Sequence, residues 1–221
     1  MIMKKYLMTI VMLACAVMAN AEGRNMGCIV KGGVNFSNMI MGVMPHGMKV
    51  GGHLGAEWDY AFSSRFGVGG GLLLNFNGAK FALDQINPVG HYFQRDNGGP
   101  IESDVNYSAI YFNIPIMAKF YITPNFTFDL GPQLGINVQN KFSSDGDKVK
   151  KVGRGLETMG ADVVAGFTYF VNKRLVLQAR YNLSLTKSWN DYEVDATGTQ
   201  TTYFNSDDRL QVIQLSVGLR F

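Results

Sequence analysis

Beyond its N-terminal leader, this chain of 221 residues lacks any run of about eighteen consecutive apolar residues, the length that a transmembrane helix requires. Charge is scarce too: charged residues make up 17% of the chain and the formal net charge is +3. Lys4 and Lys5 supply two of those charges, so the remainder (3 − 2 = +1) lacks the basic excess expected of a nucleic-acid-binding protein. The only two cysteines are Cys15 and Cys28. Because Cys15 lies in the leader, we expect one thiol in the mature chain and no intrachain disulfide.

The N-terminus has the pattern of an export signal. Lys4 and Lys5 form a positive region, an apolar run follows from Tyr6 to Met18, and Ala19-Asn20-Ala21 is a small-x-small cleavage site. We therefore predict a signal peptide over residues 1–21 and one mature domain over 22–221. Leu13-Ala14-Cys15 offers an alternative, lipoprotein-type cleavage site, although it would truncate the apolar region.

What the chain does contain is glycine and aromatic residues, with 26 Gly, 15 Phe and 10 Tyr. This composition favours an all-β protein with glycine at bends. The last eleven residues, Gln211–Phe221, alternate strictly: Ile213, Leu215, Val217, Leu219 and Phe221 share one face, and Val212, Gln214, Ser216, Gly218 and Arg220 share the other. A period of two is that of a β-strand. Ending on an aromatic residue suits a strand that stops at a membrane interface.

Seven earlier segments alternate in the same way. They are Cys28–Ser37, Lys49–Phe62, Arg65–Asn77, Val105–Ile122, Phe126–Gln139, Thr158–Val171 and Arg174–Thr186. In the third, the face opposite the apolar residues is glycine, which suits a crowded and curved barrel interior. In the fourth, Pro115 has no N–H to donate, so we expect a bulge or a local break there.

The connections between these segments alternate in length. Ser63-Ser64, Thr123–Asn125 and Asn172-Lys173 are short turns, whereas 38–48, 78–104, 140–157 and 187–208 are long polar connections. Short turns on one side and long loops on the other are typical of outer-membrane barrels. We therefore predict an eight-stranded, antiparallel, up-and-down transmembrane β-barrel with short periplasmic turns and long extracellular loops. The even strand number places both termini on the periplasmic side.

In such a barrel the apolar faces contact lipid and the polar faces line the lumen. The charged or ionisable residues on the polar faces are Lys31, His53, Glu57, Asp59, Arg65, Lys119, Asp129, Asp162, Arg174, Arg180 and Arg220. Because an eight-stranded barrel is narrow, we expect these side chains to fill it as a network of ion pairs. The alternative, a soluble sandwich, would instead place Leu177, Leu183, Leu215 and Leu219 in a dry core and Arg180 and Arg220 in water.

Aromatic residues cluster near the short turns and near the opposite rim. Trp58, Tyr60, Phe66, Phe120, Phe126, Phe128, Tyr169 and Phe221 form the first group, and Phe36, Phe76, Tyr107 and Trp189 form the second. Two girdles separated by the length of a strand fit a lipid-facing belt.

Three segments carry a family resemblance: the opening Lys31-Gly32-Gly33-Val34-Asn35-Phe36-Ser37-Asn38, the segment from Tyr111 to Tyr121 (YFNIPIMAKFY) and the C-terminal Gly218-Leu219-Arg220-Phe221. Together they resemble the PorT-like outer-membrane β-barrel family, small barrels of the OmpX/OmpA-like type. The resemblance covers the mature chain and rests on structural motifs. It implies an outer-membrane barrel, for some members a role near protein secretion, and no catalytic residues. The methionine-rich first connection and the long third connection have no counterpart in it.

Candidate sites are few, and we predict no catalytic, cofactor-binding or metal-binding residue. His46 and His91 fall in outer loops, while His53 and Glu57 share a face about 13 Å apart, too far for a direct hydrogen bond. Met39, Met41, Met44, His46 and Met48 could offer soft ligands to copper(I) but equally serve as flexible apolar filler. Asp145-Gly146-Asp147 lacks calcium-loop spacing. Lys148, Lys150, Lys151 and Arg154 could contact lipid phosphates or simply be solvated.

We therefore expect a non-enzymatic outer-membrane protein with a side-chain-filled lumen. Its expected partners are outer-membrane lipid, lipopolysaccharide and an envelope protein reached through the long loops, with no nucleic acid. Two alternatives are a narrow channel or gated path for small solutes and, third, a barrel enzyme acting on lipid or peptide.

Overall fold

The computed structural model describes residues 26–40, 46–81, 93–95, 105–144, 147–151, 159–186, 192–193, 203–204 and 209–221. Its main strands are β1 (Met26–Ile40), β3 (Lys49–Ala61), β4 (Phe66–Phe81), β6 (Val105–Thr123), β7 (Phe126–Ser144), β9 (Met159–Phe170), β10 (Leu175–Ser184) and β13 (Arg209–Arg220). Shorter strands are β2 (His46–Gly47), β5 (Phe93–Arg95), β8 (Asp147–Lys151), β11 (Tyr192–Glu193) and β12 (Tyr203–Phe204). Within the described ranges, no helix has the length and apolar character that a membrane span needs.

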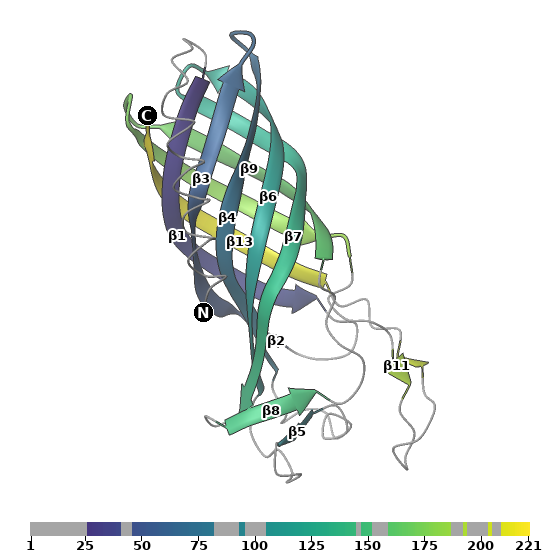
Figure 1. Cartoon of the computed structure of the whole chain (residues 1–221). Coiled ribbons are helices and arrows are strands. Elements are labelled where there is room, and N and C mark those ends of the chain that lie inside the picture. Colours follow the sequence, from purple (N-terminus) through teal and green to yellow (C-terminus); the bar gives the residue numbers. More distant parts are fainter. Residues whose placement is uncertain are drawn as a thin grey trace, which may run out of the picture.

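The eight main strands form a closed antiparallel barrel (Figure 1). Each pairs with its neighbour in sequence, and β1 closes the ring against β13 from Ile29↔Arg220 to Ile40↔Arg209. The ladder that leaves β1 at Met26 and passes through every strand returns to β1 at Phe36. This stagger tilts the strands against the barrel axis and sets its small diameter. The predicted eight-stranded up-and-down barrel is confirmed.

The predicted short turns are also confirmed. Ser63 accepts hydrogen bonds at its Oγ from the Arg65 and Phe66 N–H groups, and Asn172 Oδ1 accepts from Arg174 and Leu175. Such side-chain-to-backbone bonds are what stabilise tight turns. Both chain ends of the barrel, Met26 and Phe221, lie at this end, which we call the turn end; the other is the loop end.

β4 and β7 run several residues further toward the loop end than the alternation predicts, and β1 and β13 do so by two or three residues. Residues 78–81 continue β4 and residues 140–144 continue β7, although we expected both to be loop. Here β4 pairs with the first residues of β6, and β7 pairs with both β6 and β8. Backbone pairing, which needs no apolar face, extends these strands, so β4, β6 and β7 project past the rest of the barrel (Figure 1).

Pro115 interrupts the wall as predicted. On its β4 side the pairing passes from Leu73↔Asn113 to Gly70↔Ile116 with no partners between. The register is unchanged across this gap, so it is a local break and not a bulge. The one-residue shift between β6 and β7 on this part of the strand lies instead between Ile110 and Tyr111.

The apolar faces point outward and the polar faces inward. Leu177, Leu215 and Leu219 are 41%, 46% and 53% exposed, whereas Arg180 is 3% exposed. This arrangement excludes the sandwich alternative. Most of the predicted turn-end aromatics form a belt on the outer face, with ring centroids of Phe66 and Phe120 5.6 Å apart and of Phe126 and Phe167 5.4 Å apart.

Three residues do not lie where we predicted them. Tyr107 is not part of an outer girdle, because it faces inward and is fully buried, with its hydroxyl bonded to Tyr111 and Asn140. Arg65 and Arg174, predicted to face the lumen, are exposed in the short turns. A turn residue is not held by the ladder, so strand alternation does not extend to it. Trp189 lies outside the described residues.

Glycines on the inner wall face the long charged side chains. A Cβ on Gly71 would lie 2.5 Å from Glu57 Cγ, and one on Gly69 would lie 2.8 Å from Lys119 Cε. A Cβ on Gly166 would likewise lie too close to the Arg180 side chain, and one on Gly27 too close to the Arg220 side chain. The glycine face of the third predicted strand therefore provides room for charged side chains in a narrow lumen.

Gly71→Ala should lower the free energy of unfolding by about 1–3 kcal/mol, because the new methyl group must displace Glu57 and the Ala56 carbonyl. Gly135→Ala is the matched control: its Cβ would first meet Asn113 Oδ1 at 3.5 Å, an ordinary contact. We expect a change within about 0.5 kcal/mol for the control. Urea unfolding in lipid vesicles, followed by tryptophan fluorescence, measures both; equal losses would contradict the crowding argument.

Candidate functional site

The lumen is the candidate site, and its side chains form successive layers from the turn end to the loop end. At the turn end Ile29, Phe170 and Val176 form a small apolar cluster, each less than a tenth exposed. The guanidinium of Arg220 lies 5.1 Å from the centroid of the Phe170 ring and 3.3 Å from Asp59 Oδ2. The cation–π contact and the ion pair hold this arginine across the turn end of the barrel.

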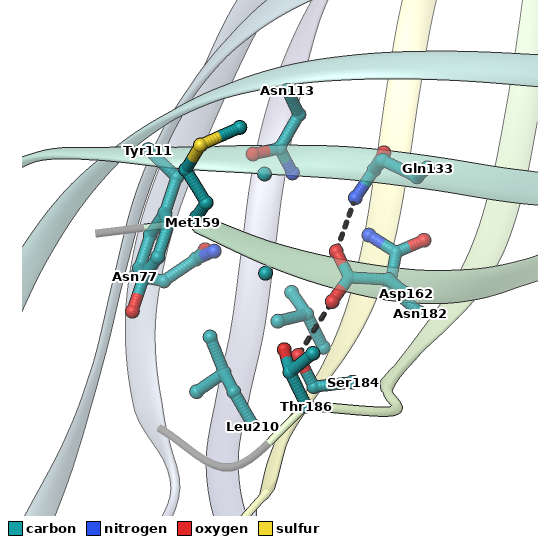
Figure 2. Close-up of a pocket in the computed structure, with 13 residues that line it drawn as sticks. Asn77, Tyr111, Asn113, Gln133, Met159, Asp162, Asn182, Ser184, Thr186 and Leu210 are labelled. Carbon is teal, nitrogen blue, oxygen red and sulfur yellow. Dashed lines mark hydrogen bonds between the residues drawn. The ribbon is translucent and has the colours of Figure 1, made fainter. Parts of the chain in front are cut away.

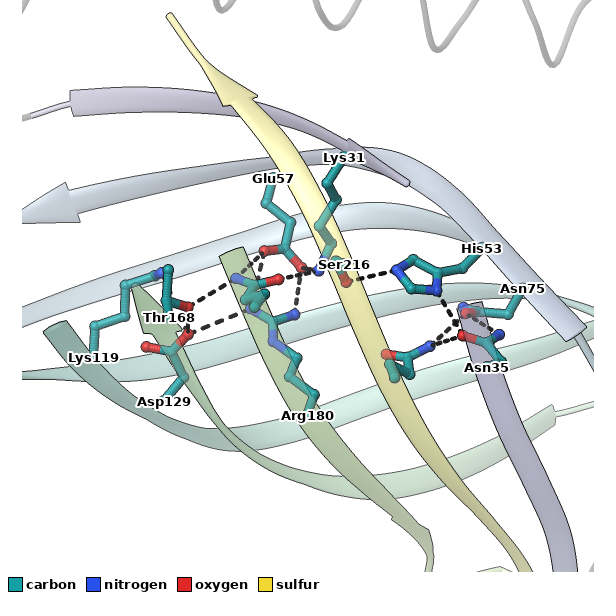
Figure 3. A network of polar contacts seen from close by, with 12 residues as sticks. Lys31, Asn35, His53, Glu57, Asn75, Lys119, Asp129, Thr168, Arg180 and Ser216 are labelled. Atoms are coloured by element: carbon teal, nitrogen blue, oxygen red, sulfur yellow. Dashed lines mark hydrogen bonds and ion pairs between the residues drawn. The ribbon is translucent and has the colours of Figure 1, made fainter. Parts of the chain in front are cut away.

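The next layer is a central charged network of Lys31, Glu57, Lys119, Asp129 and Arg180 (Figure 3). Glu57 receives the Lys31 ammonium at 2.8 Å and both terminal nitrogens of Arg180, with Nη2 donating to Oε2 at 2.9 Å. Arg180 Nη2 also lies 3.5 Å from Asp129, which pairs with Lys119 at 3.6 Å. All five side chains are at most 4% exposed.

Neutral polar groups complete this network. Thr127 and Thr168 donate hydrogen bonds to the two oxygens of Asp129, at 2.8 and 2.6 Å. Gln178 accepts from Lys31 and donates to Thr168, which ties β1 to β9 through β10. Buried charges are stable only when paired and hydrogen-bonded in this way. The network therefore blocks the lumen at mid-height.

Beyond the charged network lies a layer of amides and one imidazole (Figure 3). His53 Nδ1 lies 2.6 Å from Asn35 Oδ1 and its Nε2 lies 2.7 Å from Ser216 Oγ, so both ring nitrogens are occupied. Asn35 also donates to Asn77, while Gln214 donates to Asn75. His53 is buried, and neither of its ring nitrogens bonds a carboxylate of the described residues, as its predicted separation from Glu57 implies. This imidazole is a structural group of the lumen.

At the loop end the lumen holds a cavity of about 40 Å³ (Figure 2). Asp162 lies on its wall, accepting from Gln133 Nε2 at 2.8 Å and from Ser184 Oγ at 2.5 Å. Among the described residues Asp162 has no ion pair, so its predicted place in the charged network is wrong. It lies too near the loop end to reach the basic residues. The cavity has room for a water molecule or two and is too small for an organic substrate.

The other predicted candidates fall largely beyond the described residues. Met41, Met44, His91, Asp145, Gly146 and Arg154 lie outside them. Met48 is exposed at the loop end. Strand β8 contains Asp147, Lys148, Lys150 and Lys151. The described part of the chain contains no group of three or more His, Cys, Asp or Glu side chains placed to hold a metal ion.

Sequence reasoning missed the apolar layer at the turn end. Ile29, Phe170 and Val176 lie on inward faces that are mostly polar, and each strand contributes only one of them. Their position as the last or nearly last inward residue at the turn end is the signal that could have shown them. The amide layer was equally hidden, because Asn and Gln on a strand do not reveal their partners.

Fold and lumen together define a class: a small, all-antiparallel β-barrel with an apolar outer face, an aromatic belt and a lumen filled by paired charges. A family profile described as "Outer membrane protein beta-barrel domain" matches residues 19–190. The chain belongs to this family, which places it in the outer membrane.

Solved structures similar to this chain include three outer-membrane proteins. Ail of Yersinia pestis, in complex with the heparin analogue sucrose octasulfate, is 16% identical, with 89% of this chain and 99% of that chain covered and a TM-score of 0.49. Neisserial surface protein A is 12% identical, with 88% and 97% covered and a TM-score of 0.47. OprG from Pseudomonas aeruginosa is 11% identical, with 89% and 96% covered and a TM-score of 0.46. No curated protein matches the chain.

Glu57→Gln should lower the free energy of unfolding by about 3–5 kcal/mol, because it leaves the buried Lys31 without a carboxylate and Arg180 with only its longer contact to Asp129. Asp162→Asn, which removes a carboxylate that has no ion pair in the described structure, should cost no more than about 1.5 kcal/mol. Urea unfolding in lipid vesicles compares the two variants. A similar cost for both would mean that the ion pairs are not what Glu57 contributes.

Proposed function

We propose that this protein is a non-conducting, non-enzymatic barrel of the bacterial outer membrane, exported through a cleaved leader, that presents its loop end to another envelope component. The single observation that carries the proposal is the filled lumen. The apolar cluster at the turn end and the central charged network follow one another along the axis, and the residues of both are buried. A continuous water path would have to break several buried ion pairs.

The loop end supports the second half of the proposal. β4, β6 and β7 are 16, 19 and 19 residues long, whereas β9, β10 and β13 on the other side have 12, 10 and 12. The longer strands carry β8 and β2 as additional pairs. A one-sided extension of paired strands offers a rigid platform for a protein partner. The resemblance to PorT-like barrels favours an assembly or secretion-related partner.

In planar bilayers the purified protein should show no steady, discrete conductance, because the central charged network closes the lumen. Glu57→Ala combined with Arg180→Ala removes one acid and one base together and should produce small openings. Leu177→Ala, on the outer face, is the control and should stay closed. Steady openings of the unmodified protein would contradict the proposal and favour the alternative of a narrow solute channel.

A further inference from the structure

A groove of about 270 Å³ lies in the barrel wall at the loop end, away from the turn-end aromatic belt. Apolar side chains and cationic or polar ones share its walls: Val50, Phe76 and Ile110 on one hand, Lys49, Lys141, Ser108 and Gln139 on the other. Val50 and Phe76 are 64% and 39% exposed. The groove is therefore open and amphipathic.

The groove exists because β3 and β4 part near the rim. Their pairing ends at Gly52↔Phe76, and it resumes only between β2 and β4, at Gly47↔Lys80, with the register shifted by one residue. Between these points Lys49 stays with β1, opposite Ser37. The gap in the ladder leaves space at the wall for a side chain and for a ligand.

Lys49 bridges this gap. Its Nζ donates to the Tyr107 carbonyl at 2.8 Å and to Ser108 Oγ at 2.5 Å, both on β6. To reach them it passes Gly78 of β4, where a Cβ would lie 2.7 Å from Lys49 Cδ. The lack of a side chain at Gly78 thus lets the ammonium group reach the groove.

Two more lysines surround this ammonium group. Ser108 pairs with Gly78 on one side and with Lys141 on the other, and Lys80 follows Gly78 by two residues on the same face of β4. Lys80 and Lys141 are exposed, and their charges act on Lys49. Within the described structure none of the three has an ion pair with a carboxylate. Three adjacent cations without an acidic partner favour an anionic ligand.

The height of the groove indicates which anion is available. Phe66 of the turn-end belt and Phe76 of the groove are ten strand positions apart on β4, which for a strand tilted by about 40° corresponds to about 25 Å along the barrel axis. That is the height of the lipid-facing band of an outer-membrane barrel. Val50, Phe76 and Ile110 therefore lie at the edge of the hydrocarbon layer, and the lysines lie at the level of the headgroups.

We propose that Lys49, Lys80 and Lys141 bind the phosphate groups of a lipid A-type glycolipid of the outer leaflet, whose acyl chains pack on Val50, Phe76 and Ile110. The three cations come from three strands, β3, β4 and β7, and so match a headgroup with two separate phosphates better than a single phosphodiester. The proposal rests on the outer-membrane location and is independent of whether the lumen conducts. Its failure would leave the conductance result unaffected.

The test uses the full mature chain in a neutral detergent, titrated with bis-phosphorylated lipid A and followed by native mass spectrometry. Lys80→Gln combined with Lys141→Gln removes two exposed charges and leaves the buried bonds of Lys49 in place. Binding should weaken roughly tenfold or more, since each of the two lysines near an anionic lipid surface contributes a factor of about five in affinity. Lys173→Gln combined with Arg174→Gln removes two exposed charges at the turn end and should change nothing.

Each outcome decides the proposal. Weaker binding by the loop-end variant alone, with dephosphorylated lipid A binding poorly to the unmodified protein, supports it. Equal binding by both variants, or equal weakening of both, overturns the groove as the site. Phosphatidylglycerol binding as tightly as lipid A overturns the assignment to a bis-phosphorylated headgroup. Resistance to unfolding by detergent on a gel shows that each variant is folded before the comparison.

Discussion

The structure depends on the neutralisation of charge inside a lumen only wide enough for side chains. Glu57 makes the closest ion pairs, with Lys31 and Arg180, while Asp129 pairs at longer distance with Arg180 and Lys119. Each ion would cost several kcal/mol to bury alone. The inner-wall glycines follow from the same constraint, since Gly71 and Gly69 leave the space that Glu57 and Lys119 occupy. Ion pairing and glycine placement thus act together, and the ion pairs link β1, β3, β6, β7 and β10 across the lumen.

That design makes the two ends of the barrel different. At the turn end, the apolar cluster and the bond between Arg220 and Asp59 cover the charged network. Toward the loop end, amides replace charges, and the lumen widens to the small cavity beside Asp162. The wall itself becomes less regular there, with the shift at Ile110/Tyr111 and the parting of β3 from β4. The loop end therefore differs in backbone pairing from the rest of the barrel, in agreement with the proposal that it contacts another envelope component.

Much of this could be predicted from the chain alone, because a strand that separates lipid from a polar lumen must alternate. The eight strands, the three short turns, the break at Pro115 and the inward direction of Arg180 all follow from that rule. It fails in two places. Arg65 and Arg174 lie in turns, which the ladder does not hold, and point to solvent; residues 78–81 and 140–144 extend strands by backbone pairing, which needs no apolar face.

By itself the sequence determined which side chains share a face of each strand, since period-two alternation is local, and the pattern of short turns favoured a barrel over a soluble sandwich. Only the tertiary structure decided which charges meet. Lys31 and Gln178 are 147 positions apart, and Glu57 and Arg180 are 123 apart, so their contact depends on the register around a closed ring. The same register brings Lys49, Lys80 and Lys141 together from three strands. Alternation is a local property of each strand, whereas partnership across a barrel is set by stagger and closure.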